Sequence, residues 1–162
     1  MTLISCSFTG HRSIPDVHRA PLADLVRRAI AYVYEQGCRT FYAGGAVGFD
    51  TLAAREVLRF RMAHPEVRLV LLLPCPEQAA TFGDGARDAY DFLLREADEV
   101  RYVCSAYTPR CMRKRNELLA ELGDCVIAYV GHGRSGSSQT ARMATERGKH
   151  VYNLFRELMT NG

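Results

Sequence analysis

Short apolar runs rich in β-branched residues alternate along this chain with longer segments of helical periodicity. The pattern predicts strands in six ranges, which are 3–8, 39–43, 67–73, 99–103, 124–130 and 150–155. The runs at 67–73 and 124–130 are almost wholly apolar, as expected of parallel strands covered on both faces. The alternation therefore predicts a doubly wound α/β fold, with a mainly parallel sheet of about five to six strands and helices on both faces.

Helix signals support the same fold. In the first helical segment, apolar residues from Leu22 to Val33 recur at helical spacing after Pro21, which suits a first helical turn. Gly37, Gly123 and Gly148 each stand where a helical pattern ends and a strand begins, so we expect a left-handed conformation at each. No linker or repeat interrupts the alternation, which predicts a single domain over residues 1–162.

Composition excludes several classes of protein. The net charge of +3 does not require general binding to nucleic acid or to acidic membranes, so an anion site must be local. The six cysteines include no Cys-x-x-Cys pair and no histidine at metal-finger spacing, which argues against a zinc module and favours reduced thiols. No signal-peptide pattern is present, and the longest apolar run, residues 69–73, cannot span a bilayer. We expect a cytoplasmic protein without membrane association.

Ligands of open parallel sheets bind beyond the carboxyl ends of the strands, so the residues that follow each expected strand are the candidates. After the first strand, Thr9 and Gly10 precede His11 and Arg12, where a missing side chain, hydrogen-bond donors and positive charge suit a phosphate. A solvated loop explains the same residues about equally well. A nicotinamide fingerprint does not fit, because residues 13–20 separate this loop from the helix expected at Pro21.

The second junction is a stronger anion-site signal. Gly44, Gly45 and Gly48 let the backbone turn tightly and expose the first N–H groups of the next helix. The absence of Gly-Lys-Ser/Thr excludes a P-loop. We expect Asp50 to cap this helix, with acceptance of a ribose hydroxyl as the alternative.

The junction before the fifth strand places four cations, including Arg115, in the first turns of a helix. Arg115 falls on the apolar row that also holds Cys111, Leu118 and Leu122, which predicts an inward-facing guanidinium that needs a partner. That partner is either a ligand phosphate or carboxylate, or a structural carboxylate such as Asp50. The adjacent Asn116 can both donate and accept, which suits a base or ribose edge.

Glycine and hydroxyl residues follow the fifth strand at positions 131–138, and Ser135, Gly136 and Ser137 form a second candidate anion cradle at a helix start. A flexible loop is the alternative interpretation. Gln78, after the turn at Pro74, can hydrogen-bond a base, and Tyr107 can stack on one. The candidate ligand-binding residues are Thr9, Gly10, His11, Arg12, Gly44, Gly45, Asp50, Pro74, Gln78, Tyr107, Arg115, Asn116, Ser135, Gly136 and Ser137.

Taken together, these loops resemble the YpsA-like group of the SLOG superfamily, a Rossmann-like nucleotide-binding fold that also includes LOG phosphoribohydrolases and the DNA-processing protein DprA. The matching segments are residues 6–12, 44–50, 74–76 with Gln78, Tyr107 with Cys111 and Met112, and Arg115 with Asn116. The resemblance implies one Rossmann-like SLOG domain that binds a nucleotide or nucleotide derivative at the C-terminal edge of the sheet. It also suggests self-association.

Two positions depart from the family pattern. Ser135-Gly136-Ser137 stands where the family has Gly-Gly-Thr, and Phe82 stands where it has tryptophan. LOG enzymes carry a catalytic glutamate three residues beyond their threonine, and here that position is Thr140. The resemblance therefore leaves open whether the protein is an enzyme.

The leading hypothesis is a nucleotide-binding sensor that requires no cofactor or metal and whose partner is a mononucleotide or an ADP-ribose-like molecule. Under this hypothesis, phosphate is held by the glycine and serine loops and by Arg12, while Arg115 and Asn116 fix phosphate or ribose. One alternative is an N-glycosidic-bond hydrolase or transferase that uses Asp50 or His11 as acid or base. The other is single-stranded DNA binding through residues 44–50 and the basic residues Arg110, Arg113 and Lys114.

Overall fold

The computed structural model describes residues 3–131 and 135–160 of the protein. In this part of the chain, six strands form one sheet in the order β4-β3-β2-β1-β5-β6, and every neighbouring pair is parallel. The strands are β1 (Ser5–Gly10), β2 (Thr40–Ala43), β3 (Arg68–Leu73), β4 (Glu99–Tyr102), β5 (Cys125–Tyr129) and β6 (His150–Asn153). The predicted Rossmann-like, doubly wound α/β fold is confirmed.

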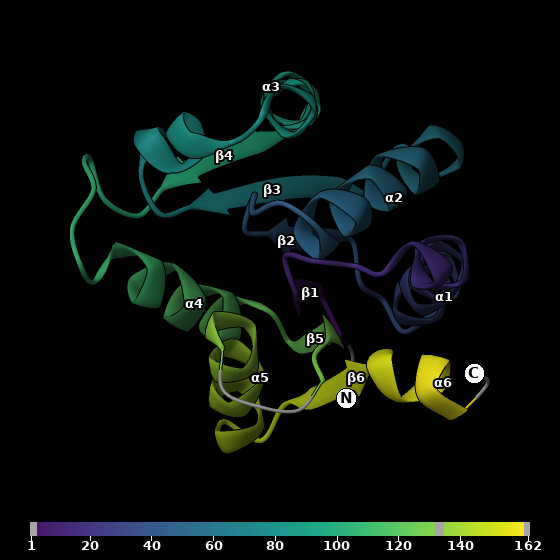
Figure 1. Ribbon diagram of the computed structural model, residues 1–162. Helices are drawn as coiled ribbons and strands as arrows, with labels where there is room; N and C mark the ends of the chain where they lie inside the picture. The colour runs from purple at the N-terminus through teal and green to yellow at the C-terminus, as the bar shows by residue number, and fades with distance from the viewer. Residues whose placement is uncertain (1–2, 132–134, 161–162) are drawn as a thin grey trace.

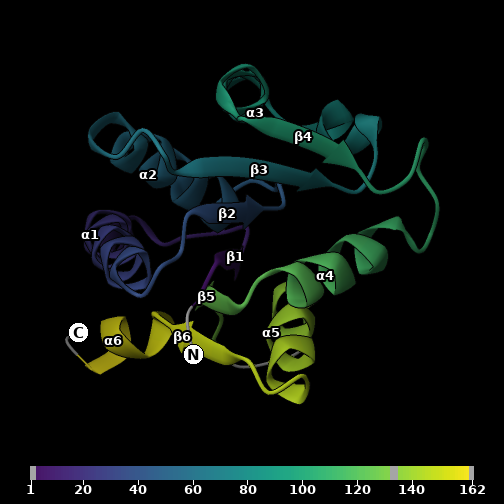
Figure 2. The same cartoon turned by 180° about the vertical axis from the view of Figure 1, so that it is seen from behind.

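Helices cover both faces of this sheet (Figures 1 and 2). Helices α1, α2, α3 and α6 pack on one face, and α4 and α5 pack on the other. Their bounds are α1 (Asp16–Glu35), α2 (Phe49–Ala63), α3 (Asp84–Glu96), α4 (Cys111–Leu122), α5 (Gly136–Glu146) and α6 (Phe155–Thr160), with a short 3₁₀ helix η1 at Pro76–Thr81. No helix within the described ranges is long and apolar enough to cross a membrane.

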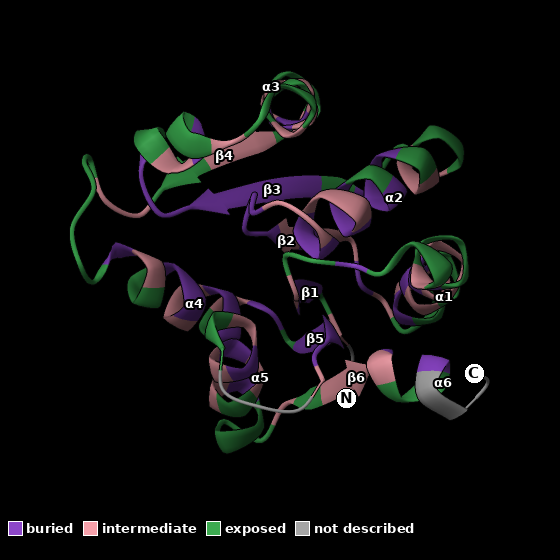
Figure 3. Ribbon diagram, viewed as in Figure 1, coloured by how far each residue is buried: buried purple, intermediate pink, exposed green. Residues whose placement is uncertain are grey.

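The central strand β1 shows how alternation divides the two faces. Cys6 and Phe8 are fully buried in the larger core under α1 and α2. Ser5 and Ser7 face α4 instead, where their hydroxyls donate to the carbonyls of Leu122 (2.8 Å) and Leu119 (2.7 Å). The Leu122 carbonyl belongs to the last turn of α4, where carbonyl groups lack helical partners, whereas the Leu119 carbonyl also accepts the Gly123 N–H at 3.3 Å. The buried centre of the sheet is visible in Figure 3.

The strand order creates a crossover point beside β1. The chain moves outward from β1 through β2 and β3 to β4, and then returns to place β5 on the other side of β1. The loops that follow β1 and β5 therefore lead to helices on opposite faces of the sheet. In open α/β sheets, the crevice between two such loops is where ligands bind.

Two local expectations were wrong. Helix α1 begins at Asp16, so Pro21 lies inside the helix and not in its first turn. The residues before Leu22 are mostly exposed, and an exposed first turn has no apolar periodicity to reveal it. Gly37 and Gly148 have the expected positive φ, but Gly123 has a φ of −73°. Glycine is required at position 123 for a different reason: a Cβ there would lie 2.5 Å from the Ser7 hydroxyl oxygen.

Candidate functional site

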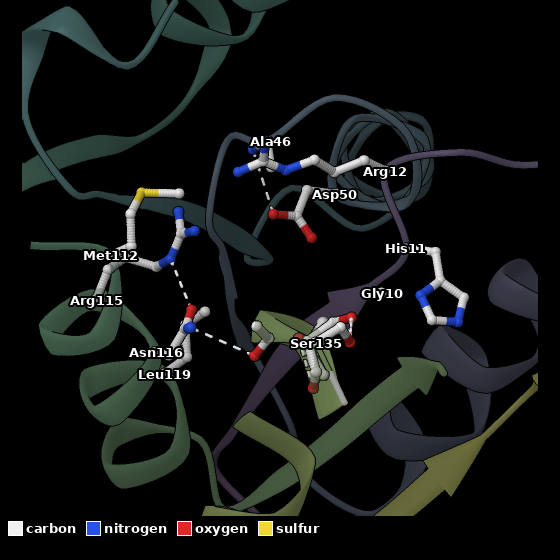
Figure 4. Close-up of a pocket in the computed structure, with 13 residues that line it drawn as sticks. Gly10, His11, Arg12, Ala46, Asp50, Met112, Arg115, Asn116, Leu119 and Ser135 are labelled. Carbon is white, nitrogen blue, oxygen red and sulfur yellow. Dashed lines mark hydrogen bonds between the residues drawn. The ribbon is translucent and has the colours of Figure 1, made fainter. Parts of the chain in front are cut away.

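A cavity of about 370 Å³ lies at the crossover between β1 and β5. The loops after β1 and β2 contribute to its wall, together with the inner face of α4 and the start of α5 (Figure 4). The lining residues are Thr9, Gly10, His11, Arg12, Ala46, Asp50, Met112, Arg115, Asn116, Leu119, Ser135, Gly136 and Ser137. Ten of the predicted site residues are thus brought together from four separate segments of the chain.

Five predicted residues do not line the cavity: Gly44, Gly45, Pro74, Gln78 and Tyr107. Gly44 and Gln78 lie behind the wall, where the Gly44 carbonyl accepts hydrogen bonds from Gln78 Nε2 (3.3 Å) and from Arg115. Tyr107 is 67% exposed in the loop between β4 and α4. His132, Gly133 and Arg134, which belong to the predicted fifth loop, lie outside the described residues.

Arg115 enters the cavity from α4 and is only 5% exposed, as its place on the apolar row predicted. Its guanidinium donates to the Gly44 carbonyl, and its Nε donates to Asn116 Oδ1 at 3.1 Å. A Cβ on Gly44 would lie 2.7 Å from the Arg115 Nη1 atom, so glycine leaves room for the guanidinium. Burial lowers the pKa of Arg115, while the nearby Asp50 carboxyl raises it.

Asp50 does not cap α2. The helix N-cap is Gly48, so Asp50 is the second helical residue, and its Oδ2 accepts the N–H of Ala46 at 3.2 Å. The carboxyl group is 6% exposed, and burial raises its pKa to about 6, against the opposing effects of Arg115, the Ala46 N–H group and Arg12. The cavity therefore contains one carboxyl that changes charge close to neutral pH.

The start of α5 supplies the serine and glycine residues of the cavity. Ser135 is the N-cap, and it forms a capping box with Ser138 through hydrogen bonds of 3.1 and 2.8 Å. Thr9 and Asn116 hold this first turn in place by donating to the carbonyls of Ser137 and Gly136, both at 3.3 Å. The positive end of the α5 dipole thus faces the cavity at Gly136 and Ser137.

His11 and Gly10 have structural partners. The His11 Nε2 atom accepts the N–H of Gly131 at 2.7 Å, which places the proton of a neutral ring on Nδ1. A Cβ on Gly10 would lie 2.4 Å from the ring of Phe49, so packing against α2 already requires glycine there. A role for either residue in ligand binding stays a prediction.

Three lining residues were not among the predicted site residues. Met112 and Leu119 lie three positions before and four positions after Arg115 on α4, and this helical spacing was the available signal. Leu118 and Leu122, which shared the predicted row, are only half-buried. Ala46, from the loop after β2, is the third.

Thr140 stands on α5 where LOG enzymes carry their catalytic glutamate. Thr140 is fully buried, and its hydroxyl donates to the Gly136 carbonyl at 3.3 Å. Asp50 is the one carboxylate that lines the cavity within the described chain. The described residues also contain no group of three or more His, Cys, Asp or Glu side chains placed to hold a metal ion.

Solved structures with a similar fold include two DNA processing proteins. The protein from Helicobacter pylori, described for its unique single-stranded DNA binding mode, has a TM-score of 0.65 and 20% identity, and the match covers 93% of this chain and 64% of that one. The protein from Streptococcus pneumoniae has a TM-score of 0.66 and 18% identity, with 91% and 49% covered. At such identities the likeness establishes the fold alone.

Sequence relatives include the UPF0398 protein of Halalkalibacterium halodurans, 26% identical over 130 residues, which are 79% of this chain and 66% of the relative. A UPF0398 protein of Bacillus cereus strain AH187 is 23% identical over 79% of this chain and 71% of the relative. The chain thus matches about two thirds of the length of these relatives. The model of the YpsA family, described as the YspA SLOG family, matches residues 15–160. The chain therefore belongs to the YpsA family of SLOG proteins.

Proposed function

We propose that the cavity beside β1 and β5 binds a nucleotide or a nucleotide-derived small molecule. The observation that carries the proposal is the convergence of the α5 N-terminus, Arg12 and Arg115 on one cavity at the crossover point of the sheet. A helix N-terminus and two guanidinium groups are the donors that proteins use for phosphate.

Charge at the site supports an anionic ligand. Neither Arg12 nor Arg115 forms an ion pair with a carboxylate within 4 Å in the described part of the chain. Arg12 is exposed, while Arg115 is held in place by Gly44 and Asn116. A fixed buried cation beside an exposed one can hold a phosphate group with little reorganisation of the site.

The size and remaining wall of the cavity indicate which part of a nucleotide it takes. A volume of about 370 Å³ is near the lower end of ligand pockets, which span roughly 300 to 1,000 Å³, and it suits one nucleotide unit. Met112 and Leu119 give an apolar wall for a base, and Asn116 and Asp50 give polar groups for a base or ribose.

Binding should depend on Arg12. Because Arg12 is exposed, Arg12→Ala should leave the fold intact and weaken the binding of an anionic nucleotide about tenfold or more, the expected effect of a lost charge-assisted hydrogen bond. Thermal-shift measurements with AMP, ADP, ATP, NAD, ADP-ribose and cyclic dinucleotides provide the test, since ligand at about a hundred times Kd adds roughly 2.7 kcal/mol.

Arg113→Ala is the matched control. Arg113 is an exposed arginine of α4 whose hydrogen bond to Glu117 points outside the cavity, so its loss removes the same charge without touching the site. If no nucleotide shifts the melting temperature of the wild-type protein, or if both variants bind equally well, the proposal fails.

Single-stranded DNA is the second candidate ligand. Two features favour it: the shared fold with a DNA processing protein described for single-stranded DNA binding, and the exposed cations Arg110, Arg113 and Lys114 at the start of α4. DNA binding would show affinity that falls steeply with salt, and here Arg113→Ala would weaken it. The two arginine variants thus distinguish the two candidates.

A further inference from the structure

A second cleft, of about 550 Å³, lies between the start of α1, α2 and α3. Within the described ranges, four arginines line it, Arg12, Arg19, Arg55 and Arg59, together with a single carboxylate, that of Glu56. This concentration of positive charge is large for a chain whose net charge is only +3. The cleft is separate from the cavity described above, but Arg12 lines both.

The Glu56 carboxylate is already paired. Glu56 is 5% exposed, and its two oxygens lie 2.9 Å from Arg27 and 3.4 Å from Arg59. Arg19 has a long surface contact with Asp16 at 3.7 Å, and the Arg55 guanidinium lies 5.9 Å from the ring centre of Phe92. These contacts leave Arg19 and Arg55 mostly uncompensated, and Arg12 faces the Asp50 carboxyl without forming an ion pair within 4 Å among the described residues. The cleft therefore keeps an excess of positive charge.

The cleft also contains apolar side chains and open space beside its arginines. Val47, Leu52 and Ala89 provide apolar surface, and nothing lies within 4 Å of the position that a Cβ on Gly85 would take. Thr51, in the first turn of α2, adds a hydroxyl group. Apolar side chains beside a group of arginines fit a sugar and base whose phosphate is held by arginine.

We propose that the ligand carries two phosphate groups in separate nucleotide units, one bound in the cavity and the other in this cleft, with Arg12 between them. The ligand class is then a short phosphodiester-linked nucleotide. This inference rests on the proposed function, because it extends the same site beyond Arg12. The single-unit size of the cavity and the cation shared with the neighbouring cleft are both explained by such a ligand.

The test compares an equimolar mixture of the four 5′-mononucleotides with a mixture of 5′-phosphorylated dinucleotides, followed by backbone amide NMR of the full chain. The amides of Gly136 and Ser137 report on the cavity, and those of Thr51 and Gly85 report on the cleft. Mononucleotides should shift the cavity amides alone. Dinucleotides should shift both sets and bind at least tenfold more tightly.

The double variant Arg19→Ala/Arg55→Ala removes two cleft cations and leaves both ion pairs of Glu56 in place. It should reduce dinucleotide affinity at least tenfold, to the mononucleotide level, without changing mononucleotide affinity. The control Arg28→Ala/Arg95→Ala removes two exposed arginines, of α1 and α3, that line neither cavity nor cleft, and should change neither affinity.

Each other outcome is decisive. In one outcome the cavity amides respond, but dinucleotides bind no more tightly than mononucleotides or do not shift the cleft amides. This result would overturn the inference and leave the proposed function standing. If dinucleotides shift the cleft amides but not the cavity amides, one ligand does not occupy both sites, and the inference of a site shared at Arg12 fails. If no nucleotide moves the cavity amides, the proposed function fails and this inference fails with it.

Discussion

Replacing Asp50 by asparagine should stabilise the ligand-free protein by about 3 kcal/mol at pH 7.5 and leave its stability nearly unchanged below pH 4. The carboxyl group is buried, and its pKa is about 6 instead of the ordinary 3.8. The charged groups that face it are Arg115 from α4 and Arg12 from the loop after β1. Their attraction does not fully offset the loss of hydration.

The direction of the pH effect follows from the two pKa values. Between pH 4 and pH 6 the folded protein holds a proton on Asp50 that the unfolded chain has lost. The free energy of unfolding therefore falls as pH rises through this range and stays at the lower value above it. Asparagine keeps an oxygen acceptor for the Ala46 N–H group and carries no charge to desolvate.

Urea denaturation of both proteins at pH 4, 6 and 7.5 measures this difference. Asp16→Asn is the control, because the Asp16 side chain is fully exposed and its replacement should change stability by less than about 0.5 kcal/mol. An Asp50→Asn protein that is less stable than wild type at pH 7.5 would contradict the prediction. For any nucleotide that is turned over, full activity of this variant would exclude Asp50 as acid or base.

The sequence was most informative where burial is continuous. Strands β3 and β5 are covered on both faces, so their runs of apolar residues located them within one residue at either end. Once the strands and their parallel order are predicted, the carboxyl-end loops must share one edge of the sheet. This is why Thr9, Asp50 and Ser135, which are far apart in the chain, could be predicted to lie together.

The remaining features depend on contacts that no local pattern encodes. The partner of Arg115 is the Gly44 carbonyl, 71 positions earlier in the chain, and a backbone acceptor leaves no mark in the sequence. Asp50 was predicted as a cap because residue type favours caps, but the positive φ of Gly48 starts α2 two residues earlier. The cleft beside Arg12 was missed because its arginines come from the loop after β1, from α1 and from α2, and resemble ordinary exposed charges.

Gly48→Ala should destabilise the protein by about 3 kcal/mol or more and abolish nucleotide binding. Gly48 has a φ of +83°, which costs an alanine roughly 1 to 3 kcal/mol. An added Cβ would also lie 2.2 Å from the Arg12 carbonyl oxygen, a backbone atom that cannot rotate away. The loops after β1 and β2 must then separate, and the Phe49 N–H bond to the His11 carbonyl (3.0 Å) is lost with their contact.

Gly85→Ala supplies the matched control, because the same substitution should raise the free energy of unfolding there instead of lowering it. Gly85 lies in the first turn of α3 with nothing within 4 Å of the added methyl group, so alanine should stabilise the helix by up to about 1 kcal/mol. Urea denaturation measures both variants. If their m values are equal, a difference in midpoint reports a change in stability and not a change in the unfolded state. Equal stability of the two variants would show that the loops after β1 and β2 move apart freely, and the cavity between them would then not be the preformed site on which the proposed function depends.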